Sequence, residues 1–303
     1  MAFMRIMKKS ADTPAPDMHE AAVAPFKARE FPYTRQDFEQ AREFIYRRAG
    51  ISLTDAKAEM VYSRLAKRLR VLAIGDFKSY LAQLNANDHP EWEHFINALT
   101  TNLTDFFREA HHFSLLVEHA HQSTYRPFRV WSAACATGEE PYSIAIALCE
   151  AFDTMPPPIR IVASDLDTDV LNKAKQGVYV AERVSGVAMK RLKRFFLKGK
   201  SAKEGSVMVR PEVRALVQFH QLNLRTDTWN IDGPFDAIFC RNVLIYFDKP
   251  TQYQVLQRLA DRLTPNGLLF AGHSESLIHA ADIFQPCGRT VYRLAHHIRT
   301  RHG

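Results

Sequence analysis

Cysteine is scarce in this sequence. Its four cysteines, Cys135, Cys149, Cys240 and Cys287, lie far apart and form no Cys-x-x-Cys pair. This spacing excludes a zinc knuckle and a thioredoxin-like redox motif. No other ligand cluster is apparent, so we expect no metal. Cysteines in apolar surroundings are most simply small core residues.

Long apolar runs are also missing. The longest stretches, such as Val243–Phe247 and Leu268–Ala271, are too short to cross a bilayer. The first residues, MAFMRIMKKSADTPAPD, contain no uninterrupted apolar segment ahead of their charges. We therefore expect a cytoplasmic protein without membrane insertion.

Neither of the two common phosphate loops, GxxxxGK[ST] and GxGxxG, follows the first expected strand. Residues 129–148 instead read RVWSAACATGEEPYSIAIAL, which predicts a strand, a tight turn at Gly138 and a helix. Open α/β sheets hold nucleotide-like ligands at such a turn. Glu139 can accept hydrogen bonds from ligand hydroxyls or an amine, whereas Glu139 and Glu140 together would repel a phosphate. S-adenosylmethionine, which carries no phosphate, fits better, and a plain structural turn remains the alternative.

The composition describes an ordinary globular protein with a basic surface. Hydrophobic residues make up 46% of the 303 residues, and the formal net charge is +7. Such a charge suits nucleic acid, an anionic membrane surface or an acidic protein partner. No recognisable nucleic-acid-binding motif accompanies the charge, so we expect no nucleic-acid partner.

The first hundred residues favour a small helical unit behind a tail. Residues 1–30 mix alanine, proline and charge without periodicity and are expected to be a disordered tail. We assign residues 31–88 to an N-terminal helical domain and residues 89–303 to a second domain. Apolar residues at helical spacing predict helices at Arg35–Ala49, Asp55–Leu72, Phe77–Leu84 and Glu91–Thr100.

Beyond Phe128, strand and helix patterns alternate, which predicts an α/β fold with a doubly wound, mostly parallel sheet. The alternation lapses at about residues 178–216, where we expect an inserted antiparallel β-subdomain with a basic helix at Val187–Lys198. The expected strands are Arg129–Ser132, Arg160–Ser164, Val217–Gln221, Phe235–Cys240, Leu268–Gly272 and, as an edge strand, Thr290–Leu294. The expected helices are Pro141–Phe152, Thr168–Gln176 and Pro250–Leu263.

Polar residues end two of the central strands. Asp165 ends the second strand, where a carboxylate can grip a ribose diol, although Asp165 or Asp167 could equally cap the next helix. Arg241 and Asn242 end the fourth strand and face the crevice by position. Tyr246 follows and can point a phenol into the same crevice, or can pack under the sheet.

Two further sets of residues have both a functional and an ordinary interpretation. Asn102, Thr104 and Arg108 lead into the sheet domain and can be ligand contacts, or helix caps and a surface charge. The helix Asp55–Leu72 has a basic face that suits an acidic, elongated partner, but solvated basic faces are common. The basic residues of this face are Lys57, Arg64, Lys67 and Arg68, with Arg70 at the margin.

Five motifs in order, TTNLTDFFRE, WSAACATGEEPYSIA, ASDLDTDVL, FDAIFCRNVLIYFD and LLFAGHSESL, resemble those of the chemotaxis receptor glutamate O-methyltransferases, the CheR family. The resemblance covers about residues 31–295. It implies an N-terminal helical domain, an S-adenosylmethionine methyltransferase fold and an inserted β-subdomain. It also implies methyl transfer to glutamate side chains of transmembrane chemoreceptors, which yields methyl esters and S-adenosylhomocysteine.

The resemblance implies roles for individual residues. Arg108 and Tyr246 lie nearest the transferred methyl and are the expected catalytic residues. Receptor contacts are expected at Arg64, Lys67, Arg68 and Arg70. The residues expected to surround S-adenosylmethionine are Asn102, Thr104, Arg108, Glu139, Asp165, Asn223, Leu224, Arg241 and Asn242. In some members the β-subdomain binds a peptide at the receptor's C-terminus by strand addition, and we expect a monomer.

A glutamate acceptor is ionised at neutral pH, so the reaction needs no general base. His273 is the one histidine within the five motifs, and therefore the one that could act as a base. The alternatives are a small-molecule or nucleic-acid methyltransferase on the same sheet, and a non-catalytic sensor of S-adenosylmethionine. Arg241-Asn242-Val243-Leu244 in place of an Asn-Pro-Pro-Tyr-like motif disfavours base methylation, and intact Arg108 and Tyr246 disfavour a sensor.

Overall fold

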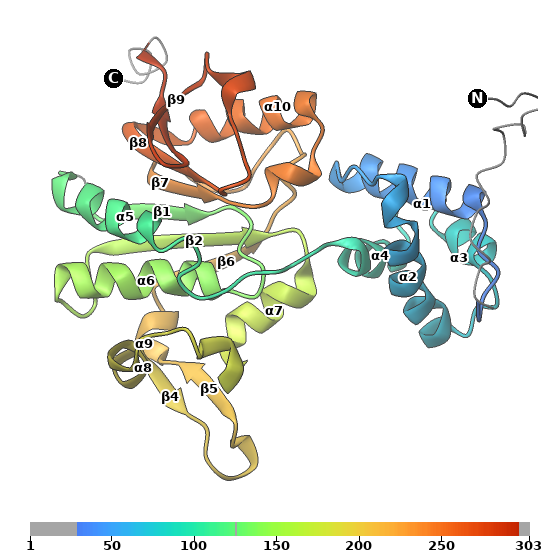
Figure 1. The fold of residues 1–303 in the computed structure, drawn as a ribbon, viewed down its shortest axis with the longest axis horizontal. Coiled ribbons are helices and arrows are strands. Elements are labelled where there is room, and N and C mark those ends of the chain that lie inside the picture. The colour runs from blue at the N-terminus through green and yellow to red at the C-terminus, as the bar shows by residue number, and fades with distance from the viewer. Residues whose placement is uncertain (1–28, 125, 297–303) are drawn as a thin grey trace, which may run out of the picture.

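The computed structural model describes residues 29–124 and 126–296, and its first unit is a bundle of four helices (Figure 1). Thr34 caps the first helix through a capping box, and Gly50 ends it with a left-handed φ of 73°. Phe38, Leu65 and Phe77 are buried at the centre of the bundle. The helices are α1 (Arg35–Ala49), α2 (Ala58–Leu72), α3 (Phe77–Gln83) and α4 (Glu91–Leu99), with a 3₁₀ turn η1 (Asp55–Lys57) before α2.

Helix α4 packs with this bundle. Phe95 and Leu99 of α4 are buried in the same apolar cluster as Phe38. The helical unit therefore includes α4 and extends past the boundary that we predicted at residue 88.

The second unit is built on a seven-stranded sheet with the order β6-β2-β1-β7-β8-β10-β9. The first five strands in this order pair in parallel, and β10 and β9 pair antiparallel at one edge. The predicted doubly wound, mostly parallel sheet is confirmed. The chain order reverses between β1 and β7, which is where open α/β sheets bind ligands. The strands are β1 (Phe128–Ser132), β2 (Ile159–Asp165), β6 (Val217–Gln221), β7 (Phe235–Cys240), β8 (Leu263–Ala271), β9 (Phe284–Gly288) and β10 (Val291–Leu294).

Helices cover both faces of the sheet. One apolar cluster joins α5 and α6 to one face, and a second joins α10 to the other. The sequence analysis missed α5, whose four histidines dilute its apolar pattern. The helices are α5 (His111–Gln122), α6 (Glu139–Phe152), α7 (Thr168–Gln176) and α10 (Lys249–Ala260). No helix within residues 29–124 and 126–296 is long and apolar enough to cross a membrane.

The edge of the sheet differs from the prediction. We expected Thr290–Leu294 to be the edge strand, but β10 lies between β8 and β9. The unpredicted β9 is the edge, and it contains Pro286. Proline lacks the N–H that an inner strand donates to its neighbour, so it is tolerated in an edge strand. The same proline disfavours a strand when only the sequence is considered, which is why β9 was not predicted.

The inserted segment forms a separate three-stranded antiparallel sheet with the order β3-β5-β4, below α6 and α7 in Figure 1. The antiparallel insert is therefore confirmed. The basic helix predicted at Val187–Lys198 is shorter, because its last residues pair as a strand. The elements are β3 (Val178–Val180), η2 (Ala181–Val184), α8 (Met189–Phe195), β4 (Phe196–Lys198), η3 (Ser201–Lys203), β5 (Ser206–Val209) and α9 (Pro211–Arg214).

Candidate active site

A cavity lies at the carboxyl ends of the parallel strands and is closed by the helical unit. Residues that follow β1, β2, β6 and β7 line it, together with the segment between α4 and α5. The predicted site residues among them are Asn102, Thr104, Arg108, Asp165, Asn223, Leu224, Arg241, Asn242 and Tyr246. The fold thus gathers residues from four separate stretches of sequence at one edge of the sheet.

Asp165 is a buried carboxylate at the end of β2, with an exposed fraction of 8%. One carboxylate oxygen accepts a hydrogen bond from the Ala136 N–H at 2.8 Å, and the other from the Asp167 N–H at 3.0 Å. Burial raises the pKa of Asp165 to about 6, against the lowering effect of these N–H groups. Each oxygen retains acceptor capacity, so Asp165 can take two hydroxyl groups of a diol.

Asp167 settles the alternative interpretation of Asp165. Its side chain accepts hydrogen bonds from the N–H groups of Asp169 and Val170 and so caps α7. Its second oxygen accepts from the Asn102 amide at 2.7 Å, which fixes the segment that carries the predicted ligand contacts. Asp165 does not cap α7, and its carboxylate lines the cavity.

Glu139 lies where we did not expect it. Its side chain is 1% exposed, does not line the cavity, and forms an ion pair with Arg183 of the insert at 2.5 Å. Glu140, the next residue, lines the cavity instead. Ser132 donates a hydrogen bond to Glu140 at 2.7 Å, and burial raises the pKa of the Glu140 carboxyl. The structure therefore favours Glu140 over Glu139 as the acidic residue of this turn that faces a ligand.

Arg241 is a buried cation that links the two sides of the cavity. Its guanidinium lies 3.0 Å from Glu140 and 3.4 Å from Glu109, and donates a hydrogen bond to the backbone carbonyl of Arg108 at 2.6 Å. Its Nε is buried without a hydrogen-bond partner among the described residues. Arg241 thus holds the Arg108 segment against the first turn of α6, and its side chain contributes to the cavity lining.

A buried carboxylate that the sequence analysis did not single out holds the loop after β7. Glu275 accepts hydrogen bonds from the N–H groups of Asn242, Leu244 and Gly272 at 2.8, 2.8 and 2.6 Å. Asn242 has a left-handed φ of 59°, and a Cβ on Gly272 would lie 2.3 Å from its side-chain nitrogen. Glu275 and Gly272 therefore shape the backbone that carries Asn242. Glu275 lies within the motif LLFAGHSESL, but only the fold shows which N–H groups it binds.

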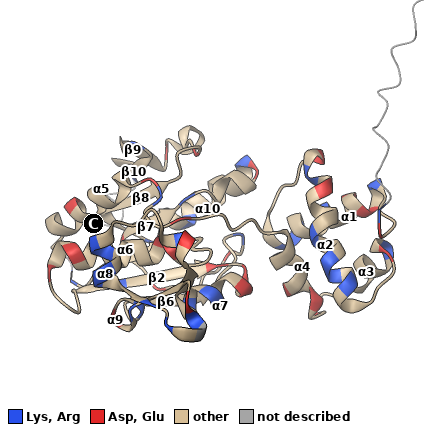
Figure 2. Cartoon of the chain, turned by 60° about the horizontal axis from the view of Figure 1, so that its bottom comes forward, with Lys and Arg blue, Asp and Glu red and all other residues tan. Residues whose placement is uncertain are grey.

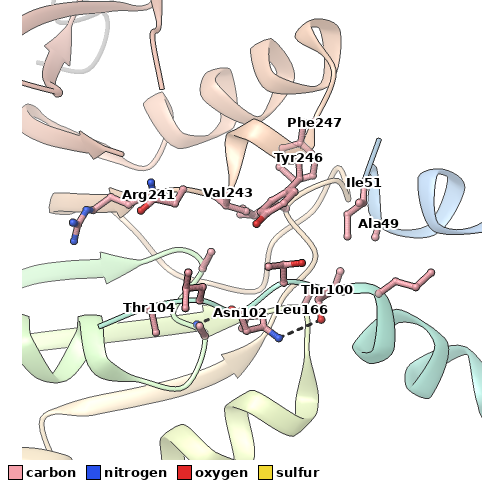
Figure 3. Close-up of a pocket in the computed structure, with 18 of the residues that line it drawn as sticks. Ala49, Ile51, Thr100, Asn102, Thr104, Leu166, Arg241, Val243, Tyr246 and Phe247 are labelled. Carbon is pink, nitrogen blue, oxygen red and sulfur yellow. Dashed lines mark hydrogen bonds between the residues drawn. The ribbon is translucent and has the colours of Figure 1, made fainter. Parts of the chain in front are cut away.

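Tyr246 and Arg108 come from opposite sides of the cavity. Figure 3 shows the Tyr246 phenol pointing into the space between the loop after β7 and the segment that contains Thr100 and Thr104. Arg108 donates a hydrogen bond to the Leu103 carbonyl at 3.2 Å, within this same segment. A phenol and a guanidinium that share one cavity can orient a carboxylate between them.

The helical unit contributes residues that we did not predict. Asn223 donates a hydrogen bond to the Arg48 carbonyl at 2.7 Å, and Ser52 donates its N–H to the Tyr246 carbonyl at 2.8 Å. These bonds tie α1 and the following loop to the loops after β6 and β7. The lining residues from this unit include Ala49, Ile51, Ser52, Leu53, Lys57, Met60 and Leu99. No motif identified them, because their contact with the sheet depends on how the two units pack.

The predicted receptor-facing residues differ in accessibility. Arg68 pairs with the buried Glu91 through two hydrogen bonds of 2.8 Å, and Arg64 donates to the carbonyls of Ala98 and Thr100 near the end of α4. Figure 2 shows the basic residues along α2. The structure gives both arginines structural partners at partly buried positions, so neither is a freely solvated side chain. Arg70 pairs with Glu30 at 2.7 Å, and Lys67 is exposed.

His273 lies outside the cavity lining. Its ring Nδ1 lies 3.1 Å from Glu109, and its side chain is 56% exposed. Within residues 29–124 and 126–296, no group of three or more His, Cys, Asp or Glu side chains could hold a metal ion.

The sheet order, the carboxylate at the end of β2 and a cavity without a phosphate loop together define a nucleoside-binding α/β protein of the S-adenosylmethionine methyltransferase class. Two family descriptions match the chain: "CheR methyltransferase, all-alpha domain" at residues 36–100, and "CheR methyltransferase, SAM binding domain" at residues 102–293. The chain belongs to the CheR methyltransferase family.

Individual relatives agree with this assignment. The chain is 53% identical over 269 residues to "Chemotaxis protein methyltransferase 2" of Pseudomonas aeruginosa. This match covers 88% of this chain and 96% of that protein. It is 51% identical over 259 residues to "Chemotaxis protein methyltransferase" of Salmonella typhimurium. This match covers 85% of this chain and 90% of that protein. A solved S-adenosylmethionine-dependent methyltransferase of Clostridium acetobutylicum is 14% identical to this chain with a TM-score of 0.33. The match covers 61% of this chain and 57% of that chain. The protein is therefore a methyltransferase of the chemotaxis system with an S-adenosylmethionine-binding domain.

Proposed function

We propose that the protein transfers a methyl group from S-adenosylmethionine to glutamate side chains in the cytoplasmic helical domain of transmembrane chemoreceptors, giving methyl esters and S-adenosylhomocysteine. One observation carries the proposal. A single cavity is lined by a buried carboxylate, Asp165, which can accept a diol, and by Arg108 and Tyr246, which can orient a carboxylate. The names of the relatives support the link to chemotaxis.

The residues of the cavity suit S-adenosylmethionine. Asp165 would take the ribose diol, and the buried Leu224 offers an apolar surface for adenine beside the Asn223 amide. Glu140 suits the α-amino group, and Arg241 beside it in the cavity lining suits the α-carboxylate. Asn102, Thr104 and Asn242 complete the lining. When bound there, the donor supplies an electrophilic methyl group on a sulfonium.

The protein's own residues contribute position and desolvation. The acceptor carboxylate is already ionised at neutral pH, so no residue needs to remove a proton from it. Arg108 and Tyr246 would hold it in line with the transferred methyl. The negative carboxylate and the positive sulfonium neutralise one another in the displacement, so their transfer from water into a closed cavity favours the transition state.

Receptor recognition extends beyond the cavity in this proposal. The basic surface of α2 would face the acidic helical domain of the receptor, with Lys67 and Arg70 as its accessible residues and the partly buried Arg64 and Arg68 supporting the helix. The β-subdomain would bind a C-terminal receptor peptide in those systems that have one. We further propose that the protein acts as a cytoplasmic monomer.

Incubation with membranes that contain individual receptors and methyl-labelled donor tests the function. We expect label on receptor peptides that is released as methanol by mild alkali, because a glutamate methyl ester hydrolyses readily while an N-methyl group does not. Receptors with the labelled glutamates changed to alanine provide the control. Alkali-stable label, or label confined to small molecules or nucleic acid, would contradict the proposal.

A further inference from the structure

The inserted subdomain, residues 178–216, is packed against segments that line the cavity. The Tyr179 hydroxyl donates a hydrogen bond to the Thr137 carbonyl at 2.8 Å, in the turn before α6. The Tyr179 ring contacts Phe106 edge-on with centroids 5.0 Å apart, and Phe106 contacts Phe196 of β4 in the same manner at 5.4 Å. The insert therefore supports both the turn after β1 and the segment between α4 and α5.

Arg183 of η2 adds ion pairs and a hydrogen bond to these aromatic contacts between the insert and the cavity-lining segments. Its guanidinium pairs with Glu139 at 2.5 Å and with Asp105 at 3.2 Å, and it also donates a hydrogen bond to the backbone carbonyl of Thr104. Thr104 lines the cavity, whereas Arg183 does not. One side chain of the insert thus holds the first turn of α6 against a cavity-lining loop.

Glu139 depends on this contact. Its carboxylate is 1% exposed, and within the described residues Arg183 is the one cation within ion-pair distance of it. The Thr137 hydroxyl also donates a hydrogen bond to this carboxylate at 2.6 Å, but a neutral donor offsets only part of the cost of burying a charge, so loss of the cation favours movement of the side chain. Movement of Glu139 would displace its neighbour Glu140, which lines the cavity beside Arg241.

We propose that Arg183 is a positioning residue for donor binding, so that the inserted β-subdomain forms part of the donor site and is more than a docking module. This inference rests on the proposed function, in which the cavity binds S-adenosylmethionine. Arg183 acts through Glu139 at the start of α6 and through Thr104 in the facing segment.

Calorimetric titration of the full-length protein with S-adenosylhomocysteine tests the proposal. Arg183→Met should weaken binding by about 10- to 100-fold, the effect of one lost charged hydrogen bond. The Michaelis constant for donor should rise, while that for receptor and the turnover at saturating donor should stay within about threefold of wild type. Arg183→Lys, which retains the charge but loses the two-pronged contact, should show an intermediate affinity and provides the measurement if Arg183→Met does not fold.

A double-mutant cycle identifies the route of the effect. Arg183→Met and Glu139→Gln remove the same ion pair, so their effects on donor affinity should be strongly non-additive, with the double variant binding donor no worse than Arg183→Met alone. Arg194→Met is the matched control, since Arg194 lies in the same insert and pairs weakly with the exposed Asp153 at 3.6 Å.

Unchanged affinity in a folded Arg183→Met variant, or a loss no larger than that of Arg194→Met, overturns the inference. Strictly additive effects of the Arg183 and Glu139 changes also overturn it, because they would show that Arg183 does not act through Glu139. Absence of any binding by the wild type contradicts the proposed function instead, so the two failures are distinguishable.

Discussion

At the scale of single residues, the site combines carboxylates that burial makes reluctant to ionise. Burial raises the pKa of Asp165 to about 6, and it raises the pKa of Glu140 and Glu275 as well. Each of these groups accepts hydrogen bonds from nearby N–H or O–H donors, which offset part of the desolvation. Asp165 accepts a backbone N–H of the turn after β1, and Glu275 accepts backbone N–H groups of the loop after β7, so these carboxylates help to hold both segments in place.

Asp165 makes donor affinity depend on pH. The ordinary aspartate pKa of 3.8 is raised in the folded protein, so the carboxyl favours its protonated form, and this contribution to stability is lost as pH rises through about 6. Two ligand hydroxyls need the ionised form, so donor binding should weaken below pH 6. Asp165→Ala should weaken binding by about 1–3 kcal/mol at pH 7.5 and remove this pH dependence. Calorimetry at pH 5.5 and 7.5 measures both effects, and equal affinity in the folded variant contradicts the ribose role.

Tyr246 should act on the acceptor rather than on the donor. Tyr246→Phe removes the hydroxyl and keeps the ring that packs at the cavity wall. We expect lower turnover with nearly unchanged donor affinity, because the interaction matters mainly in the transition state. Equal losses of donor binding and turnover would instead mark Tyr246 as a structural or donor-binding residue.

Glu275 should affect donor binding beyond its effect on stability. Glu275→Gln keeps the shape but places an amide N–H₂ against a backbone N–H, which should weaken donor binding by about 1–3 kcal/mol. Asp236 is the matched control, since this buried carboxylate also accepts a backbone N–H, from Arg129 at 2.8 Å, but lies at the other end of β7. Asp236→Asn should lower the unfolding temperature without changing donor affinity. If both variants bind donor equally well, Glu275 has no positioning role.

At the scale of elements, α2 shows why a basic stripe is not a uniform docking surface. Its arginines at positions 64 and 68 bond to α4 and the residues just after it, which fastens the two helices to one another. Lys67 lies between them in sequence but points to solvent. Because an α-helix has about 3.6 residues per turn, side chains that are adjacent in sequence point in different directions. Arg64 and Arg68 therefore contact α4, while Lys67 is exposed to solvent.

Charge reversal at single positions of α2 distinguishes a role in helix packing from a role in receptor binding. Arg68→Glu places a second carboxylate beside Glu91, which is 5% exposed, and should lower the unfolding free energy by about 3 kcal/mol or more. Lys67→Glu should leave stability within about 0.5 kcal/mol and raise the Michaelis constant for receptor. Denaturant titration and receptor kinetics at two salt concentrations measure both, because screening should weaken a charge-driven contact. Receptor kinetics that respond neither to Lys67→Glu nor to salt would leave α2 as a solvated face.

At the scale of the whole molecule, three parts meet at one cavity. The sheet supplies strand ends, the helical unit closes the cavity, and the insert holds the turn after β1 and the loop before α5. The expected chemistry needs no group that titrates near neutral pH. His112 is buried, which lowers its pKa to about 4 and leaves it neutral at pH 7.

Turnover at saturating donor and receptor should therefore be roughly flat from about pH 6.5 to 8.5, and should fall only as the acceptor protonates near its ordinary pKa of about 4.3 or as the protein unfolds. His273→Gln should leave the profile unchanged, since His273 does not line the cavity. A bell-shaped profile whose limb near pH 6.5 disappears in a folded His273→Gln variant would make His273 catalytic.

The sequence by itself determined the order of most elements and the polar residues at the strand ends that line the cavity. Strand and helix periods are local properties, so the parallel sheet, the insert and the residues at strand ends, such as Asp165 and Arg241, could be read from the pattern. The motifs also identified the family. These features depend on residues that lie near one another in the chain.

Tertiary structure alone decided which neighbouring residues line the cavity. Glu139 and Glu140 are adjacent and chemically identical, but they point roughly 100° apart around α6, and the packing of the insert against Glu139 leaves Glu140 for the cavity. The backbone partners of Glu275 and the pairing of Arg68 with Glu91 could not be predicted from the sequence either. Such contacts join residues far apart in the chain, and no local period encodes them.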